Sequence, residues 1–64
     1  MIRYVFKVKG ENKFYKDNDN LVDSPIDGLL FENEFIASVL VNVRDDLQLC
    51  VVDFSVNSCE PVVK

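Results

Sequence analysis

Histidine is absent from this 64-residue chain, and glycine is rare. Histidine is the commonest general base and the commonest metal ligand, so its absence removes the Ser–His and Cys–His pairs of nucleophilic catalysis. The two glycines, Gly10 and Gly28, are too few for a glycine-rich phosphate loop. A chain of this length also leaves little room for a substrate pocket. We therefore expect no enzymatic activity and no bound cofactor.

Long apolar runs are lacking as well. No stretch approaches the roughly 18 apolar residues that cross a bilayer, and charges interrupt the first apolar residues, so we expect neither a membrane segment nor a signal peptide. We expect a cytoplasmic protein, in which Cys50 and Cys59 stay reduced and Cys50 packs in a strand. A disulfide between them is the alternative. Two thiols without histidine make half of a zinc site, so we expect no bound metal.

The apolar content is high for such a short chain. Hydrophobic residues make up 48% of the sequence, enough for a packed core and too many for a disordered chain. A chain of this size forms one domain, residues 1–64, and buries only about 60% of its unfolded surface. We expect some apolar surface to remain for a partner or for a second copy of the chain.

The first two strands are predicted from alternation and a turn. Residues 2–9 alternate with the period of a half-buried strand, which places Phe6 on one face and Val5 on the other. A turn containing Gly10 follows, and residues 13–17 are predicted to return as the second strand of a hairpin. The next stretch, to residue 28, is polar and favours turns, apart from a short helical turn predicted to begin near Pro25.

The middle of the chain is ambiguous. Apolar residues recur every four positions from Phe31 to Val43, as on one face of a helix. The β-branched residues near the end of this run favour a strand instead. We predict a short helix or irregular segment at 30–36 and a strand at 37–43, with a single helix over 30–43 as the alternative.

The strongest strand signal lies at residues 47–56, where both faces are apolar. Such a strand is typical of the centre of a sheet that is covered on both sides. Asp53 interrupts the apolar pattern and is expected near the strand's end, and the tail from Asn57 is expected to be loose or a poor edge strand because it contains Pro61. The sequence thus predicts an α+β, β-rich domain with about four antiparallel strands in two hairpins (2–9/13–17 and 37–43/47–56) and at most one short helix near 25–36.

Charge is distributed unevenly along the chain. Residues 1–16 carry five basic residues against one acid, a net charge of +4, and residues 17–64 carry two against ten, a net charge of −8. Like charges gathered in one part of a small domain repel each other, which favours a partner of opposite charge. We predict that the acidic part of this chain docks on a basic surface of a larger protein. The candidate partner-binding residues are Asp17, Asp19, Asp23, Asp27, Glu32, Glu34, Asp45 and Asp46.

Two other functions stay open. The basic first hairpin, with its interleaved aromatic residues, is a candidate for binding single-stranded nucleic acid by stacking and phosphate contacts. Those aromatics are expected to form the core, and the acidic remainder would repel a polyanion, so a nucleic-acid partner is disfavoured. A small structural or oligomer-forming subunit, dimerising through open sheet edges, is the second alternative.

One stretch resembles a known family. Residues 44–54, through Asp45, Asp46, Cys50, Val52 and Asp53, resemble the C-terminal part of the Dmd-type phage antitoxins. That family blocks a host RNase toxin by inserting into its active-site cleft. The resemblance implies a non-catalytic phage inhibitor of a bacterial defence system, which is our leading hypothesis for this chain.

Overall fold

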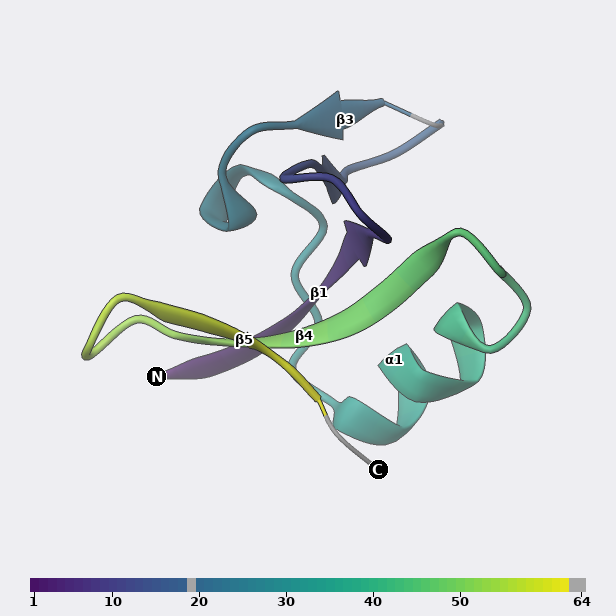
Figure 1. Cartoon of the computed structure of the whole chain (residues 1–64). Coiled ribbons are helices and arrows are strands. Elements are labelled where there is room, and N and C mark those ends of the chain that lie inside the picture. The colour runs from purple at the N-terminus through teal and green to yellow at the C-terminus, as the bar shows by residue number, and fades with distance from the viewer. Residues whose placement is uncertain (19, 63–64) are drawn as a thin grey trace.

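The computed structural model describes residues 1–18 and 20–62, which form a five-stranded antiparallel sheet and one α-helix (Figure 1). The strand order is β3-β2-β1-β4-β5. The predicted α+β, β-rich fold is confirmed. In chain order the elements are β1 (Ile2–Val8), β2 (Phe14–Tyr15), β3 (Leu21–Val22), the 3-10 turn η1 (Pro25–Asp27), α1 (Glu34–Val41), β4 (Leu47–Asp53) and β5 (Ser58–Pro61).

Strand β4 lies in the interior of the sheet, with a neighbour on each side, as its apolar pattern predicted. It pairs along its whole length with β1, from Leu47 opposite Val8 to Asp53 opposite Ile2, and its other edge pairs with β5. Asp53 is the last residue of β4, where it was expected. The chain after Asn57 forms β5, an edge strand. Pro61 is tolerated there because Val62 donates the hydrogen bond to β4, so the Pro61 nitrogen faces the open edge, where no N–H is needed.

The core is divided by the sheet into two clusters. One cluster lies between the sheet and α1 and contains Phe6, Leu47 and Leu49 together with Ala37 and Val41 of the helix. The other lies on the opposite face and contains Val5, Phe14, Cys50 and Val52. The predicted division of the β4 side chains between two covered faces is therefore confirmed.

Strand β1 is more deeply buried than its alternation suggested. Val5 is fully buried, so β1 is covered on both faces rather than half-buried. The cover comes from the segment around Gly28, where a Cβ atom would lie 3.0 Å from Val5 Cγ2 and 3.1 Å from the Tyr15 carbonyl oxygen. Glycine is required there by this close approach and not by its φ angle. From Gly28 the chain runs to Phe31, whose backbone exchanges two hydrogen bonds of 2.8 Å with Tyr4.

The predicted strand at 37–43 is wrong, because these residues belong mainly to α1. Asn33 is the helix N-cap, and its side-chain oxygen accepts a hydrogen bond of 3.0 Å from the Ile36 N–H. Both edges of β4 are already paired with β1 and β5, so no edge of β4 is open to a strand at 37–43. The helical alternative is correct in kind, but the helix covers only Glu34–Val41. Packing overrides the strand preference of β-branched residues here.

Other local predictions were partly correct. The short helical turn at Pro25 is confirmed as η1, with the proline at its start. The predicted second strand, 13–17, is reduced to Phe14–Tyr15, and the polar stretch after it contains the short strand Leu21–Val22. The predicted hairpin 37–43/47–56 does not exist, since β4 forms its hairpin with β5 instead.

Candidate protein-binding surface

The predicted acidic contact residues lie in three parts of the chain. Asp17 and Asp23 lie in the connections before and after β3, Asp27 ends η1, and Asp19 lies outside the described residues. Two more acids, Glu32 and Glu34, lie at the start of α1. The remaining pair, Asp45 and Asp46, lies between α1 and β4. The seven described acids are therefore spread over three places, two of which flank α1.

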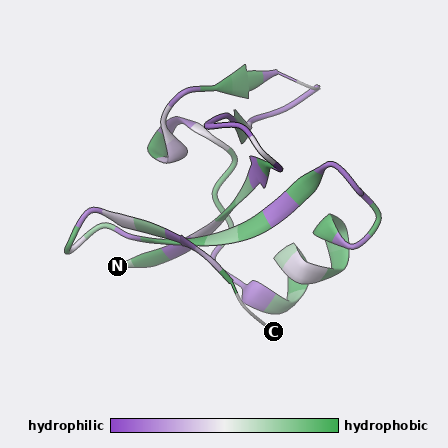
Figure 2. Ribbon diagram, viewed as in Figure 1, coloured by the Kyte–Doolittle hydropathy of each residue, from purple (hydrophilic) through white to green (hydrophobic). Residues whose placement is uncertain are grey.

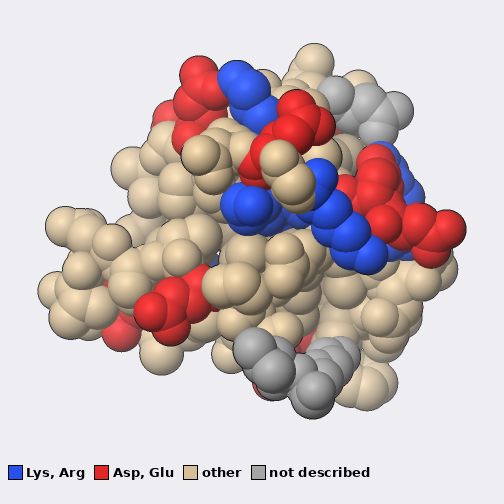
Figure 3. Space-filling model, in the orientation of Figure 1, with Lys and Arg blue, Asp and Glu red and all other residues tan. Residues whose placement is uncertain are grey.

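Three of these acids are paired with cations of the chain itself. Glu32 lies 3.2 Å from Arg3, and Asp23 contacts Lys13, so the basic first hairpin is partly neutralised by the acidic remainder. Figure 3 shows red and blue atoms side by side in the upper part of the view. The charge asymmetry of the sequence is thus reduced by folding.

The third pair makes the most hydrogen bonds of the three. Arg44 donates from Nε to Asp46 Oδ1 and from an Nη atom to Oδ2, both at 2.9 Å, which is a two-point contact. This hydrogen bonding lowers the pKa of Asp46 below its usual value of 3.8. The guanidinium carbon of Arg44 also lies 5.8 Å from the centre of the Tyr15 ring. Arg44 is therefore held in place over the end of the sheet.

The acids at the two ends of α1 differ from these pairs. Among the described residues, Glu34 and Asp45 make no ion pair, and both are exposed. Glu34 lies in the first turn of α1, where a negative charge is favoured by the helix dipole. Asp45 follows the helix by four residues. Negative charge is consequently available at both ends of the helix.

The outer face of α1 is apolar and uncovered. Its residues are mainly hydrophobic, as the green helix in Figure 2 shows, and Glu34 is its one charged residue. Ala37, Ser38 and Val41 face the sheet. A contiguous exposed apolar surface of this kind on a small protein marks an interaction site. The exposed side chains, with their exposed fractions, are Phe35 (75%), Ile36 (51%), Val39 (50%) and Leu40 (45%) of the helix, continued by Val43 (80%) two residues beyond its end.

This surface was partly visible in the sequence. The four-residue recurrence that includes Phe35, Val39 and Val43 is the signal of a helix face, and such a stripe normally marks the buried side. In the fold the stripe points outward, because Ala37 and Val41 take the contacts with the sheet. The high apolar content predicted leftover surface, but only the structure places it on α1.

A hollow of about 280 Å³ adjoins this face at the C-terminal end of the helix. Leu40 and Val43 form one side, Leu29 and Phe31 form another, and Leu47 of β4 also lines it. Phe6, Tyr15 and Arg44 complete the lining. Its walls are therefore almost entirely apolar, and they continue the exposed surface of α1 inward.

A second, wider hollow lies beyond Arg44. It shares Tyr15, Arg44 and Leu47 with the first and has a volume of about 510 Å³. Its walls also include two carboxylates, those of Glu11 and Asp46. Asp46 is bound to Arg44, and within the described residues Glu11 makes no ion pair. The two hollows together form a groove that is apolar at one end and acidic at the other.

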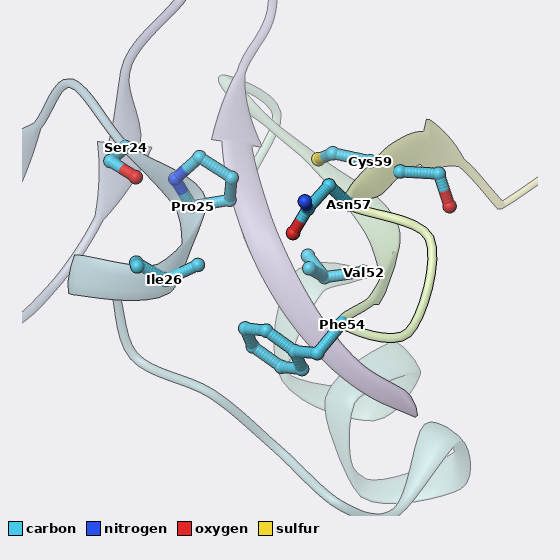
Figure 4. A pocket seen from close by; sticks show the side chains of 8 residues that line it. Ser24, Pro25, Ile26, Val52, Phe54, Asn57 and Cys59 are labelled. Atoms are coloured by element: carbon cyan, nitrogen blue, oxygen red, sulfur yellow. The ribbon is translucent and has the colours of Figure 1, made fainter. Parts of the chain in front are cut away.

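A third hollow, of about 270 Å³, lies between η1 and the β4–β5 hairpin (Figure 4). Ile26 and Phe54 point into it from the two sides, and Cys59 borders it. Among the side chains that line this hollow, the Cys59 thiol is the only titratable group, and partial burial raises its pKa from 9.0. A raised pKa keeps more of the thiol protonated near neutral pH, which makes Cys59 a weaker nucleophile than an ordinary free cysteine.

The two cysteines are close to each other and reduced. Cys59 lies opposite Val52, and Cys50 lies opposite Pro61, which makes the two cysteines diagonal neighbours on one face of the sheet. Burial and the adjacent Cys59 thiol raise the pKa of Cys50 to about 11. Within residues 1–18 and 20–62, no three histidine, cysteine, aspartate or glutamate side chains gather as metal ligands do.

The aromatic residues of the first hairpin lie inside the protein. Phe6 and Phe14 are buried, and Tyr4 and Tyr15 are partly buried against the α1-side cluster. Phe6 packs on Tyr15 and Phe31, with ring centres 5.0 Å apart for Phe6 and Phe31, and Phe14 lies in the cluster on the opposite face of the sheet. The expectation that the hairpin aromatics belong to the core therefore holds for Phe6 and Phe14, which leaves only part of the Tyr4 and Tyr15 rings exposed.

Comparison with protein-family models, curated proteins and solved structures finds no match to this chain. In the part of the chain that the structure describes, every helix is too short to traverse a lipid bilayer.

Proposed function

We propose that this chain is a non-catalytic protein-binding domain that acts by covering a surface of a larger protein. The observation that carries the proposal is the exposed apolar face of α1. A helix that presents apolar side chains to solvent is the usual ligand of a hydrophobic groove on another protein. The inhibitory role, and a phage origin, take their support from the resemblance of residues 44–54 to Dmd-type antitoxins.

The size of the apolar face gives a first estimate of what it contributes to binding. Burying a large apolar side chain fully contributes about 1.5–3 kcal/mol. The five exposed side chains of this face are already partly buried, so covering the rest contributes roughly 5–9 kcal/mol in total. Association itself costs about 4–15 kcal/mol. By itself, the helix face is therefore sufficient only for weak binding. Tight binding requires further contacts with the partner.

The acids beside α1 are the first of these further contacts. Glu34 and Asp45 lie at opposite ends of the apolar face and carry no ion pair among the described residues. A partner with an apolar groove and basic residues at its rim would meet both. Rim charges of this kind mainly increase the rate of association and its salt dependence. The proposal thus keeps Glu32, Glu34, Asp45 and Asp46 as contact residues and gives the central role to α1.

The test is affinity capture from a bacterial lysate with three forms of the protein. Phe35→Asp places a charge in the apolar face, and its position in the first turn of α1 suits a negative side chain. Val56→Asp is the matched control, since Val56 is 69% exposed in the β4–β5 turn, away from α1. We expect the wild type and Val56→Asp to retain the same protein and Phe35→Asp to lose it. Retention of that protein by all three forms would overturn the proposal.

A further inference from the structure

We infer that the groove beside α1 accepts a partner segment in which one large apolar residue is followed closely by a lysine or arginine. This inference rests on the proposed function and specifies the chemistry of the partner. The apolar residue would enter the hollow between Leu40, Val43 and Leu29. The basic residue would then lie in the wider hollow, beside Glu11 and Asp46.

The apolar end of the groove sets the first requirement. Apart from Arg44 at its margin, the lining of the first hollow carries no charged side chain. Leu29, Leu40 and Val43 are 40%, 45% and 80% exposed, so their apolar surface faces water until a ligand covers it. A volume of about 280 Å³ is sufficient for one large aliphatic or aromatic side chain. Hot spots of interfaces are commonly single anchors in pockets of this kind.

The acidic end sets the second requirement. Arg44 stands between the two hollows, but its charge is balanced by the two-point contact with Asp46. Glu11 then adds a carboxylate that has no ion pair among the described residues. The charged side chains of the groove therefore sum to a net negative charge, in a chain whose overall charge is −4. A basic residue next to the anchor complements this charge.

A second copy of this chain fits the same surface poorly. In an antiparallel pairing of two α1 helices, Glu34 of one copy would face Asp45 of the other, and in a parallel pairing each acid would face itself. Both arrangements place acids opposite each other, and the repulsion between them would disfavour the dimer. The nearby Arg3 and Arg44 are bound to Glu32 and Asp46. Charge complementarity thus favours a basic partner over self-association.

The test is selection of a random peptide library displayed on phage against the wild-type protein, after depletion of the library on Val43→Asp. Val43 follows α1 and is 80% exposed, so an aspartate there changes the hollow without removing core contacts. We expect the enriched peptides to share an apolar residue with a lysine or arginine close to it. Because the protein has no tryptophan, a peptide with a tryptophan anchor reports its own burial through a blue shift of its fluorescence.

Charge variants test the second part of the inference. Glu11→Gln removes the groove carboxylate that has no ion pair among residues 1–18 and 20–62, and Glu60→Gln removes an exposed carboxylate on β5 as the matched control. We expect Glu11→Gln to weaken the selected peptides by about two- to fivefold, as for an exposed ion pair, and Glu60→Gln to leave them unchanged. Val43→Asp should weaken them by about tenfold or more.

Four outcomes would overturn the inference. In the first three, the enriched peptides lack basic residues, bind Val43→Asp as tightly as the wild type, or fail to emerge at all. A dimer that grows with concentration in light scattering and disappears in Val43→Asp would instead assign the groove to a second copy. In each of these outcomes the loss of partner capture by Phe35→Asp is still expected. A failure of the groove chemistry is therefore distinguishable from a failure of the proposed function.

Discussion

Raising the pH should destabilise the protein through Cys50. The thiol is buried in the centre of β4, and burial together with the Cys59 thiol raises its pKa from 9.0 to about 11. In the unfolded chain the thiol ionises near pH 9, whereas the folded chain keeps it protonated up to about pH 11. The protonated Cys50 thiol therefore makes its full contribution to the free energy of unfolding below pH 9. This contribution is lost as the pH rises through 11.

The magnitude follows from the size of the pKa difference. One pKa unit corresponds to about 1.4 kcal/mol, so the full loss is about 3 kcal/mol and the loss between pH 8 and 10.5 is about 2 kcal/mol. A 64-residue domain is marginally stable, so this loss is a large share of its free energy of unfolding. Urea unfolding followed by far-ultraviolet circular dichroism measures it directly.

The comparison that isolates the thiol is wild type against Cys50→Ala. Every other group of the chain is the same in both proteins, so the difference between their two slopes of unfolding free energy against pH belongs to Cys50. We expect the wild type to lose about 2 kcal/mol more than Cys50→Ala between pH 8 and 10.5. Cys59→Ala should keep most of this loss, because burial is the larger cause of the raised pKa. Equal pH dependence in wild type and Cys50→Ala would refute the reasoning.

Three further perturbations test the fold. Gly28→Ala should cost about 1–3 kcal/mol in urea unfolding, since its Cβ would lie 3.0 Å from Val5 Cγ2; an unchanged midpoint would show that the contact is absent. Asn33→Ala should cost about 1 kcal/mol by removing the α1 N-cap, while Asn33→Asp should retain the cap; equal losses in the two variants would contradict this role. Arg44 lowers the pKa of Asp46, so this pair stabilises the fold above pH 3.8 and ceases to do so as the pH falls. Arg44→Gln should raise the pKa of the Asp46 carboxyl measured by NMR. An unshifted titration of Asp46 in this variant would argue against the pair.

The sequence alone determined the elements whose signals are local. The alternation of β1, the two apolar faces of β4 and the turn at Pro25 each depend on residues that are neighbours along the chain. The burial of Cys50 followed from its place in a strand that is apolar on both faces. The prevalence of acids after residue 16 was also plain, but it did not reveal where those acids would lie.

Tertiary structure decided the rest, because these features depend on residues that meet only in the fold. Whether 37–43 became strand or helix depended on the edges of β4, which β1 and β5 occupy. The pairing of Arg3 with Glu32 joins distant parts of the sequence and partly offsets the charge asymmetry between them. The apolar stripe of α1 faces outward because the small Ala37 allows the helix to approach the sheet on its other side, which leaves Phe35 and Val43 exposed. A hydrophobic pattern indicates that a helix face is suited to being buried. Only the packing of the fold shows whether the chain itself buries that face or leaves it for a partner.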